Sequence, residues 1–135
     1  MRKQASATFT LKSWDEKAYD EMEGAPKLTR VSATKSYHGD IEGEGKLEYL
    51  MMYRNAGSAS FIGLERVTGS VSGRSGSFVL QHRGAFEGGI AKVTLSVVPG
   101  SGTGDLHSMS GEGGFDAGHQ PPYAMTLDYG FERDI

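Results

Sequence analysis

The chain of 135 residues contains no cysteine. Disulfides, thiolate metal ligands and cysteine nucleophiles are therefore excluded, and the fold must rest on packing alone. No apolar run is long enough to cross a membrane, and the start MRKQASATFTL lacks the apolar stretch of a signal peptide. We therefore predict a cytoplasmic protein with no membrane partner.

The chain also lacks the motifs of common cofactor and metal sites. The glycine-rich segment VPGSGTGDL has neither the Walker lysine nor the G-x-G-x-x-G spacing, so we predict a wide turn there. The histidines form no HExxH or H-x-H pattern; they are His38, His82, His107 and His119. No serine lies in a G-x-S-x-G elbow. We predict no cofactor and no metal.

Neither sign of charge dominates the composition. The net charge is -3 and the basic residues are scattered along the chain. Such a chain has no positive field that would collect phosphates, so nucleic acid is not a predicted partner.

Glycine is abundant, with 20 residues against only 4 prolines. This is about twice the usual glycine share of roughly 7%. In a β protein, glycine supplies tight turns and sharp strand bends. The length predicts one domain, residues 1–135, with a single core.

Period-two alternation of apolar and polar residues predicts an all-β fold. We expect eight strands, at residues 5–14, 27–38, 43–54, 59–72, 75–87, 90–98, 106–115 and 123–133. The one helix candidate is 15–23, where Ser13 and Glu16 could form a capping box; a charged loop is the alternative. Sequential strands with short turns predict a meander that closes into an antiparallel eight-stranded β-barrel.

Turn residues predict the pairing of the central strands. Gly73-Arg74 suits a type II′ turn, and strands joined by it would place Glu65 directly opposite His82. A second turn at Gly88-Gly89 would place His82 opposite Leu95. Both turns put the same residues on one face, which should point into the core: Phe61, Val67, Phe78, Leu80, Phe86, Val93, Leu95 and Val97.

Glu65 and His82 are the polar exceptions on this inward face. A buried carboxylate needs a hydrogen-bond partner, and a facing imidazole can supply one. Pairing Tyr53 with Phe61 would bring Tyr49 opposite Glu65 and complete a polar row. The pair is either a functional site or an interior ion pair that only fixes strand register, and both interpretations stay open.

The candidate site combines these polar residues with inward aromatic and aliphatic ones. Glu65 and His82 are the catalytic candidates, and the ligand-binding candidates are Tyr49, Phe61, Phe86, Leu95 and Tyr129. Tyr129 shares a face with Met125 and Leu127, so a core role is its alternative.

The opposite strand face carries apolar residues on adjacent strands: Leu50, Met52, Ile62, Leu64 and Val79. Several outward apolar residues are more than a monomer usually leaves exposed to water. They predict a homo-oligomer, or a covering segment such as residues 15–26.

Several segments together resemble a bacterial family of unknown function, number 3224 in the domain-of-unknown-function series: EYLMMY, GLERVTG, GRSGSFVLQHRGAFEGG, VPGSGTGDL and TLDYGFE. The resemblance covers nearly the whole chain. It implies an eight-stranded barrel similar to allene oxide cyclase. It does not imply the cyclase reaction, because fold analogy cannot carry chemistry and no catalytic motif of the cyclases matches here.

Three functions fit these observations. The favoured one is a binding module that holds a small, largely apolar ligand in the barrel, with Glu65, His82 and Tyr49 at its polar end. The second is an isomerase or cyclase in which His82 acts as acid or base and Glu65 holds its tautomer. The third is an interaction oligomer whose barrel is filled by side chains.

Overall fold

The computed structural model describes residues 2–118 and 120–132, and these residues form strands, turns and loops but no helix. The strands are β1 (Lys3–Asp20), β2 (Lys27–Gly39), β3 (Ile41–Asn55), β4 (Ser58–Val71), β5 (Arg74–Glu87), β6 (Ile90–Val97), β7 (Thr103–Gly104), β8 (Met109–Ala117) and β9 (Tyr123–Phe131). All pairings are antiparallel, so the predicted all-β antiparallel class is confirmed. No described segment is a helix with the length and apolar character needed to cross a membrane.

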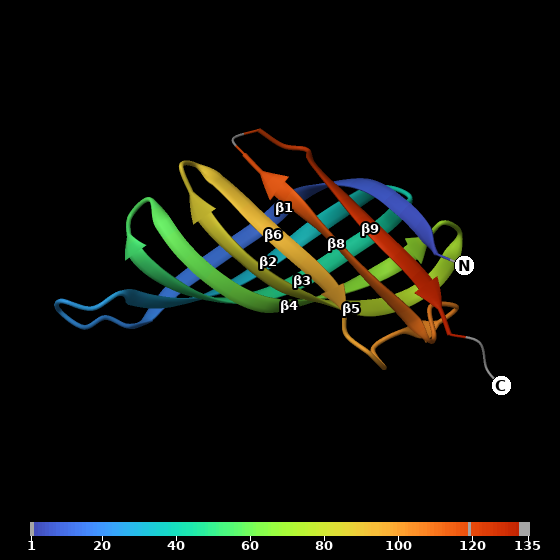
Figure 1. Ribbon diagram of the computed structural model, residues 1–135, viewed down its shortest axis with the longest axis horizontal. Coiled ribbons are helices and arrows are strands. Elements are labelled where there is room, and N and C mark those ends of the chain that lie inside the picture. Colours follow the sequence, from blue (N-terminus) through green and yellow to red (C-terminus); the bar gives the residue numbers. More distant parts are fainter. Residues whose placement is uncertain (1, 119, 133–135) are drawn as a thin grey trace.

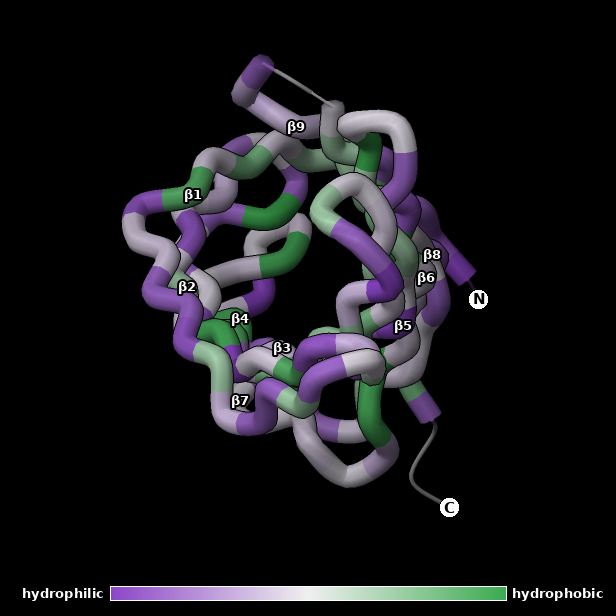
Figure 2. Tube along the Cα trace, turned by 90° about the vertical axis from the view of Figure 1, so that its left-hand side faces the viewer, coloured by the Kyte–Doolittle hydropathy of each residue, from purple (hydrophilic) through white to green (hydrophobic). Residues whose placement is uncertain are grey.

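The long strands pair in a ring. Each pairs with the next along the chain, with the two-residue β7 skipped between β6 and β8, and β9 returns to pair with β1. Figures 1 and 2 show the strands arranged around a common interior. Buried apolar side chains fill much of this interior, including the predicted inward residues Val67, Phe78, Leu80, Val93, Leu95 and Val97.

The predicted helix at 15–23 is wrong. Residues up to Asp20 continue β1, and residues 13–20 pair with β2 in a hairpin that projects beyond the ring (Figure 1). Ser13 bonds to Thr34 across the hairpin, with 2.7 Å between their hydroxyl oxygens, and so does not act as a helix cap. A short isolated helix is marginal, whereas an extended segment here gains a full ladder with β2.

The predicted turn at Gly73-Arg74 is also wrong, by one position. Val71 pairs with Arg74, so Ser72 and Gly73 form the loop, with φ of 47° and 88°. Positive φ at both loop residues belongs to a type I′ turn rather than the expected type II′ turn, and both types match the twist of the flanking strands. Each residue of β4 therefore pairs with a residue of β5 that lies two positions before the predicted partner. A shift of two positions leaves every side chain on its predicted face. The Gly88-Gly89 turn lies where it was predicted.

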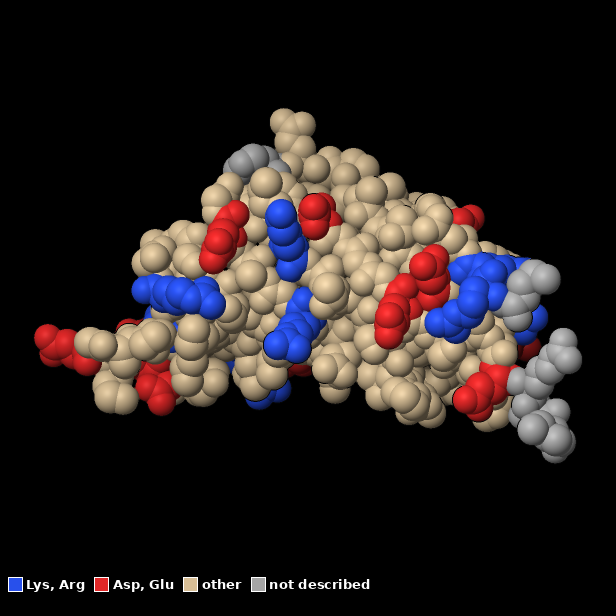
Figure 3. Space-filling view, in the orientation of Figure 1, with Lys and Arg blue, Asp and Glu red and all other residues tan. Residues whose placement is uncertain are grey.

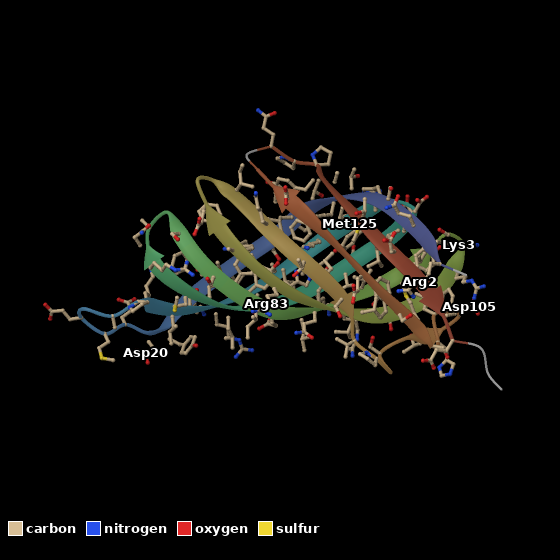
Figure 4. All side chains as sticks on the ribbon, in the orientation of Figure 1. Arg2, Lys3, Asp20, Arg83, Asp105 and Met125 are labelled. Carbon is tan, nitrogen blue, oxygen red and sulfur yellow. The ribbon has the colours of Figure 1, made fainter. Side chains whose placement is uncertain are left out.

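The two ends of the ring differ. At one end, here called the β7 end, lies the segment between β6 and β8, whose β7 pairs with β5 and whose Leu106 is fully buried. The other end, here called the hairpin end, carries the β1–β2 hairpin and the turns that join β3 to β4 and β5 to β6. Figure 4 labels Asp20 on this hairpin and Asp105 at the opposite end of the molecule.

The outer surface carries mixed charges and an apolar patch on β3 and β4. Positive and negative side chains are interspersed on the face drawn in Figure 3. The patch consists of Leu50, Ile62 and Leu64, which are 47%, 55% and 53% exposed. Since these residues are exposed and residues 15–20 are paired with β2, the expectation that residues 15–26 cover the patch is wrong.

Candidate functional site

A fully buried carboxylate, that of Glu65 on β4, lies inside the ring. Its Oε1 accepts hydrogen bonds from His82 Nε2 at 2.7 Å and from Lys35 Nζ at 3.3 Å. Its other oxygen, Oε2, accepts the hydroxyl of Tyr37 at 2.6 Å. Donors from β2 and β5 thus satisfy a charge that would otherwise be costly to bury.

The predicted partner of Glu65 is correct, but the predicted geometry is not. Leu80, and not His82, lies directly opposite Glu65, and His82 pairs with Gly63. On the other side of β4, Gly63 pairs with Tyr49, so the expected pairing of Tyr49 with Glu65 is also wrong. His82 reaches Glu65 diagonally, because two residues along a strand separate side chains that share a face.

Two glycines let polar side chains reach across an intervening strand. Gly63 lies on β4 between Tyr49 and His82, and the Tyr49 hydroxyl lies 2.8 Å from His82 Nδ1. Gly45 lies on β3 opposite Lys35, and a Cβ placed on it would collide with Glu65 Oε2. A Cβ at Gly63 would likewise meet the Tyr49 ring. In both places the missing side chain provides the space for the polar contact.

The hydrogen bonds define the tautomer of His82. Nε2 carries the proton that it donates to Glu65, so Nδ1 is the acceptor for the Tyr49 hydroxyl. Burial lowers the pKa of His82 in spite of its hydrogen bond to Glu65, which keeps the imidazole neutral. Burial and the Glu65 charge both raise the pKa of Tyr49, so the phenol keeps its proton.

Lys35 and Glu65 form a buried ion pair next to the hydrogen bonds of His82. Burial would raise the pKa of Glu65, but the Lys35 charge and the hydrogen bonds from His82 and Tyr37 outweigh it and lower the pKa to about 2. Burial lowers the pKa of Lys35, and the Glu65 charge opposes that shift. Burial and the Glu65 charge together raise the pKa of Tyr37. The cluster therefore holds one positive and one negative charge.

A cavity of about 330 Å³ opens at the hairpin end beside this cluster. Its lining is mainly aromatic and aliphatic: Phe9, Leu11, Trp14, Lys35, Leu47, Tyr49, Met51, Tyr53, Ala56, Phe61, Phe86, Ala91, Val93, Phe115, Ala117 and Tyr123. Lys35 and Tyr49 belong both to the lining and to the polar cluster. Glu65 and His82 are not among the lining residues, so they lie behind the surface that a ligand would contact.

The structure brings together some of the residues predicted to bind a ligand and separates others. Tyr49, Phe61 and Phe86 line the cavity. Leu95 and Tyr129 are buried but are not part of its lining. Among the described residues, no group of three or more histidine, aspartate or glutamate side chains is placed to hold a metal ion.

Lys35 was not among the predicted site residues, although the sequence contains a signal for it. Strand alternation puts Lys35 on the same face as Val31, Ala33 and Tyr37, and all four are buried. A lysine on the apolar face of a strand is unusual enough to single out, since lysine is rarely buried without a partner.

Trp14 and Glu16 escaped detection for a different reason. The register between β1 and β2 shifts between Leu11 and Ser13, which is a β-bulge that changes which residues face the interior. Beyond the bulge, Trp14 lines the cavity, and Glu16 accepts the hydroxyl of Tyr53 at 2.6 Å. Alternation counted from the start of the strand gives the wrong face for both.

We expect Glu65→Ala to lower stability more than His82→Ala. Loss of the carboxylate leaves Lys35 without its counter-charge, and removing one partner of a buried ion pair costs about 3–5 kcal/mol. Loss of His82 leaves Glu65 with two other donors, for a cost of about 1–3 kcal/mol. The control is Glu44→Ala, whose solvent-exposed pair with Lys12 should leave the stability nearly unchanged. Urea denaturation of the three variants measures their free energies of unfolding. A larger loss in His82→Ala than in Glu65→Ala would contradict the prediction.

Stability should also fall in two steps as the pH decreases. Both His82 and Glu65 have a lower pKa in the folded chain than their ordinary values of 6.5 and 4.5, so the unfolded chain binds more protons. The His82 contribution is lost below pH 6.5, and the Glu65 contribution is lost between pH 4.5 and about 2. Each step has a limiting slope of about 1.4 kcal/mol per pH unit. Urea denaturation across this pH range should show that His82→Gln lacks the upper step. In Glu65→Gln the lower step should be smaller than in the wild type but still present, because Glu16, Glu44 and Glu48 also have a lowered pKa. A variant whose step equals that of the wild type contradicts the assignment.

Comparison with known proteins adds family membership but no activity. No curated protein matches the chain. A crystal structure of a protein of unknown function from the DUF3224 family of Shewanella oneidensis MR-1 is similar, with 29% sequence identity and a TM-score of 0.84 over 98% of this chain and 100% of that one. The model of the family described as "Protein of unknown function (DUF3224)" matches residues 5–129. The chain therefore belongs to the DUF3224 family.

Proposed function

We propose that the protein binds a small, largely apolar molecule in the interior of the ring, which we interpret as a closed barrel of the kind found in allene oxide cyclase. The observation that carries the proposal is the cavity of about 330 Å³ at the hairpin end. This volume lies at the lower end of the range of about 300–1,000 Å³ that is typical of small-molecule sites.

The composition of the cavity wall supports this function. Most lining residues are apolar, and aromatic rings from several strands surround the space, including Phe9, Phe61 and Phe115. Lys35 and Tyr49 add a few polar groups on one side. Apolar walls with a small number of placed polar groups give affinity through burial and orientation through hydrogen bonds.

An isomerase or cyclase acting on such a molecule is the second candidate. The observation in its favour is the chain from Glu65 through His82 to Tyr49, whose last member lines the cavity. His82 would act on a ligand through the Tyr49 hydroxyl, because His82 itself does not line the cavity. Binding ranks ahead of catalysis, since burial raises the pKa of Tyr49 and makes its phenolate a costly intermediate.

A homo-oligomer is a separate proposal that rests on the outer patch. Leu50 lies directly opposite Ile62 on β3 and β4, and Leu64 extends the same face. The patch lines a shallow groove together with Arg30 and Glu48, which form an ion pair with 3.0 Å between Arg30 Nε and Glu48 Oε1. A second copy related by a two-fold axis can therefore bury the apolar residues and place opposite charges against each other.

A neutral apolar fluorophore tests the binding function. N-phenyl-1-naphthylamine should gain fluorescence with the wild-type protein, because the cavity removes it from water. Ala91→Phe places a ring at a lining position and should reduce this gain severalfold, whereas the matched control Ala124→Phe adds the same ring at an exposed position outside the lining. Thermal melting establishes that both variants are folded. Equal fluorescence of the two variants would rule out binding in this cavity.

Light scattering coupled to size exclusion tests the oligomer. We expect a mass above that of the 14.5 kDa chain at micromolar concentration. Ile62→Glu should shift the protein to the monomer, because it puts a charge in the centre of the patch. A monomeric wild-type protein across this concentration range would contradict the proposal.

A further inference from the structure

Lys35 has hydrogen-bonding capacity that the protein does not use. Its side chain is 2% exposed and lines the cavity. An ammonium group has three N–H donors. Within residues 2–118 and 120–132, Glu65 is its one hydrogen-bond acceptor, at 3.3 Å. The remaining donors are available to an oxygen atom of a molecule in the cavity.

Aromatic rings hold this ammonium group in place. Nζ lies 4.1 Å from the centre of the Phe9 ring and 4.8 Å from that of Phe115. The two rings pack edge to face, with their centres 4.9 Å apart. Both rings line the cavity, so a flat ligand that reaches Lys35 lies against aromatic walls.

The charge of Lys35 is already balanced. Glu65 is ionised and lies within hydrogen-bond distance, and His82 beside it is neutral. An anionic ligand would place a second negative charge close to Glu65 in an apolar interior. Among the described lining residues, no other lysine or arginine could compensate for that charge. Electrostatics therefore favours a neutral acceptor over a carboxylate.

Tyr49 offers the complementary group. Its hydroxyl proton is donated to His82 Nδ1, which leaves the phenol oxygen as an acceptor on a cavity-lining residue. The polar side of the cavity thus presents a donor at Lys35 and an acceptor at Tyr49.

We infer that the ligand is a neutral, flat, mostly apolar carbonyl compound whose oxygen accepts a hydrogen bond from Lys35. This inference rests on the proposed binding function and specifies its ligand class. It is carried by the unused donors of Lys35, the aromatic walls around them and the charge balance with Glu65.

Three probes of nearly the same shape test the inference on the wild-type protein: 2-acetylnaphthalene, 2-ethylnaphthalene and 2-naphthoate. A hydrogen bond to a charged donor predicts that the acetyl compound binds about tenfold more tightly than the ethyl compound. Naphthoate should bind more weakly than the acetyl compound. NMR titration gives the affinities, and a ¹³C label on the acetyl carbonyl reports the hydrogen bond directly as a downfield shift in the complex.

The outcomes separate this inference from the binding function. Equal affinities for the acetyl and ethyl compounds, with no carbonyl shift, would overturn the inference and leave apolar binding intact. Tightest binding of naphthoate would overturn the charge argument. Failure of all three probes to bind would count against both, and the fluorophore experiment would show whether the cavity binds apolar molecules at all.

A double variant assigns the donor. Lys35→Met alone leaves Glu65 as an unpaired buried charge, so we combine it with Glu65→Gln, which removes both charges and keeps the side-chain shapes similar. The acetyl preference should fall to less than about twofold in this variant, since the charge-assisted bond is gone. A preserved preference would show that another group provides the hydrogen bond. If the double variant does not fold, the wild-type affinities and the carbonyl shift still decide the question.

Discussion

The carboxylate of Glu65 is the constraint around which the interior is arranged. A charge on β4 with no exposure to solvent must be matched inside the ring, and its three donors come from β2 and β5. β5 is a neighbour of β4, but β2 is separated from it by β3. The contacts of Glu65 with Lys35 and Tyr37 therefore connect β4 to β2, which does not pair with it. The contact with His82 connects β4 to its neighbour β5. A two-residue slip of β2 would keep every side chain on its face but would move Lys35 and Tyr37 away from the carboxylate, which would then keep only the His82 donor.

Glycine makes these cross-strand contacts possible. Gly45 on β3 lies between Lys35 and the Glu65 carboxylate, and Gly63 on β4 lies between Tyr49 and His82. Each missing side chain opens space inside the ring for a contact between strands two apart. The high glycine content is thus only partly a matter of turns. Gly45 and Gly63 are as necessary to the polar cluster as the residues that carry its charges.

Much of the fold followed from the sequence because strand alternation is a local property. The inward positions of Leu80, Phe78 and Val67 survived a wrong turn assignment, since an error of two residues in register keeps every side chain on its face. The turn itself was missed because Ser72 adopts a positive φ, which the sequence signal for Gly73-Arg74 did not indicate.

The candidate site was less accessible to sequence reasoning. Trp14 and Glu16 depend on a β-bulge near Lys12, and alternation alone gives no sign of a bulge. The pair of Glu65 and His82 was found because both residues interrupt an apolar face. Lys35 interrupts the face of β2 in the same way, but its connection to Glu65 spans a strand and is visible only in three dimensions.

The division of labour within the cluster bears on its function. Glu65 and His82 lie behind the cavity wall and contribute to the structure. Lys35 and Tyr49 line the cavity and also contact Glu65 and His82, respectively. Since Glu65 supplies the counter-charge, Lys35 can donate a hydrogen bond to a neutral molecule without losing its ion pair. An acidic ligand would instead compete with Glu65 for the ammonium group and weaken the contact between β2 and β4. The interaction that holds these strands together thus also limits the charge of what the cavity can accept.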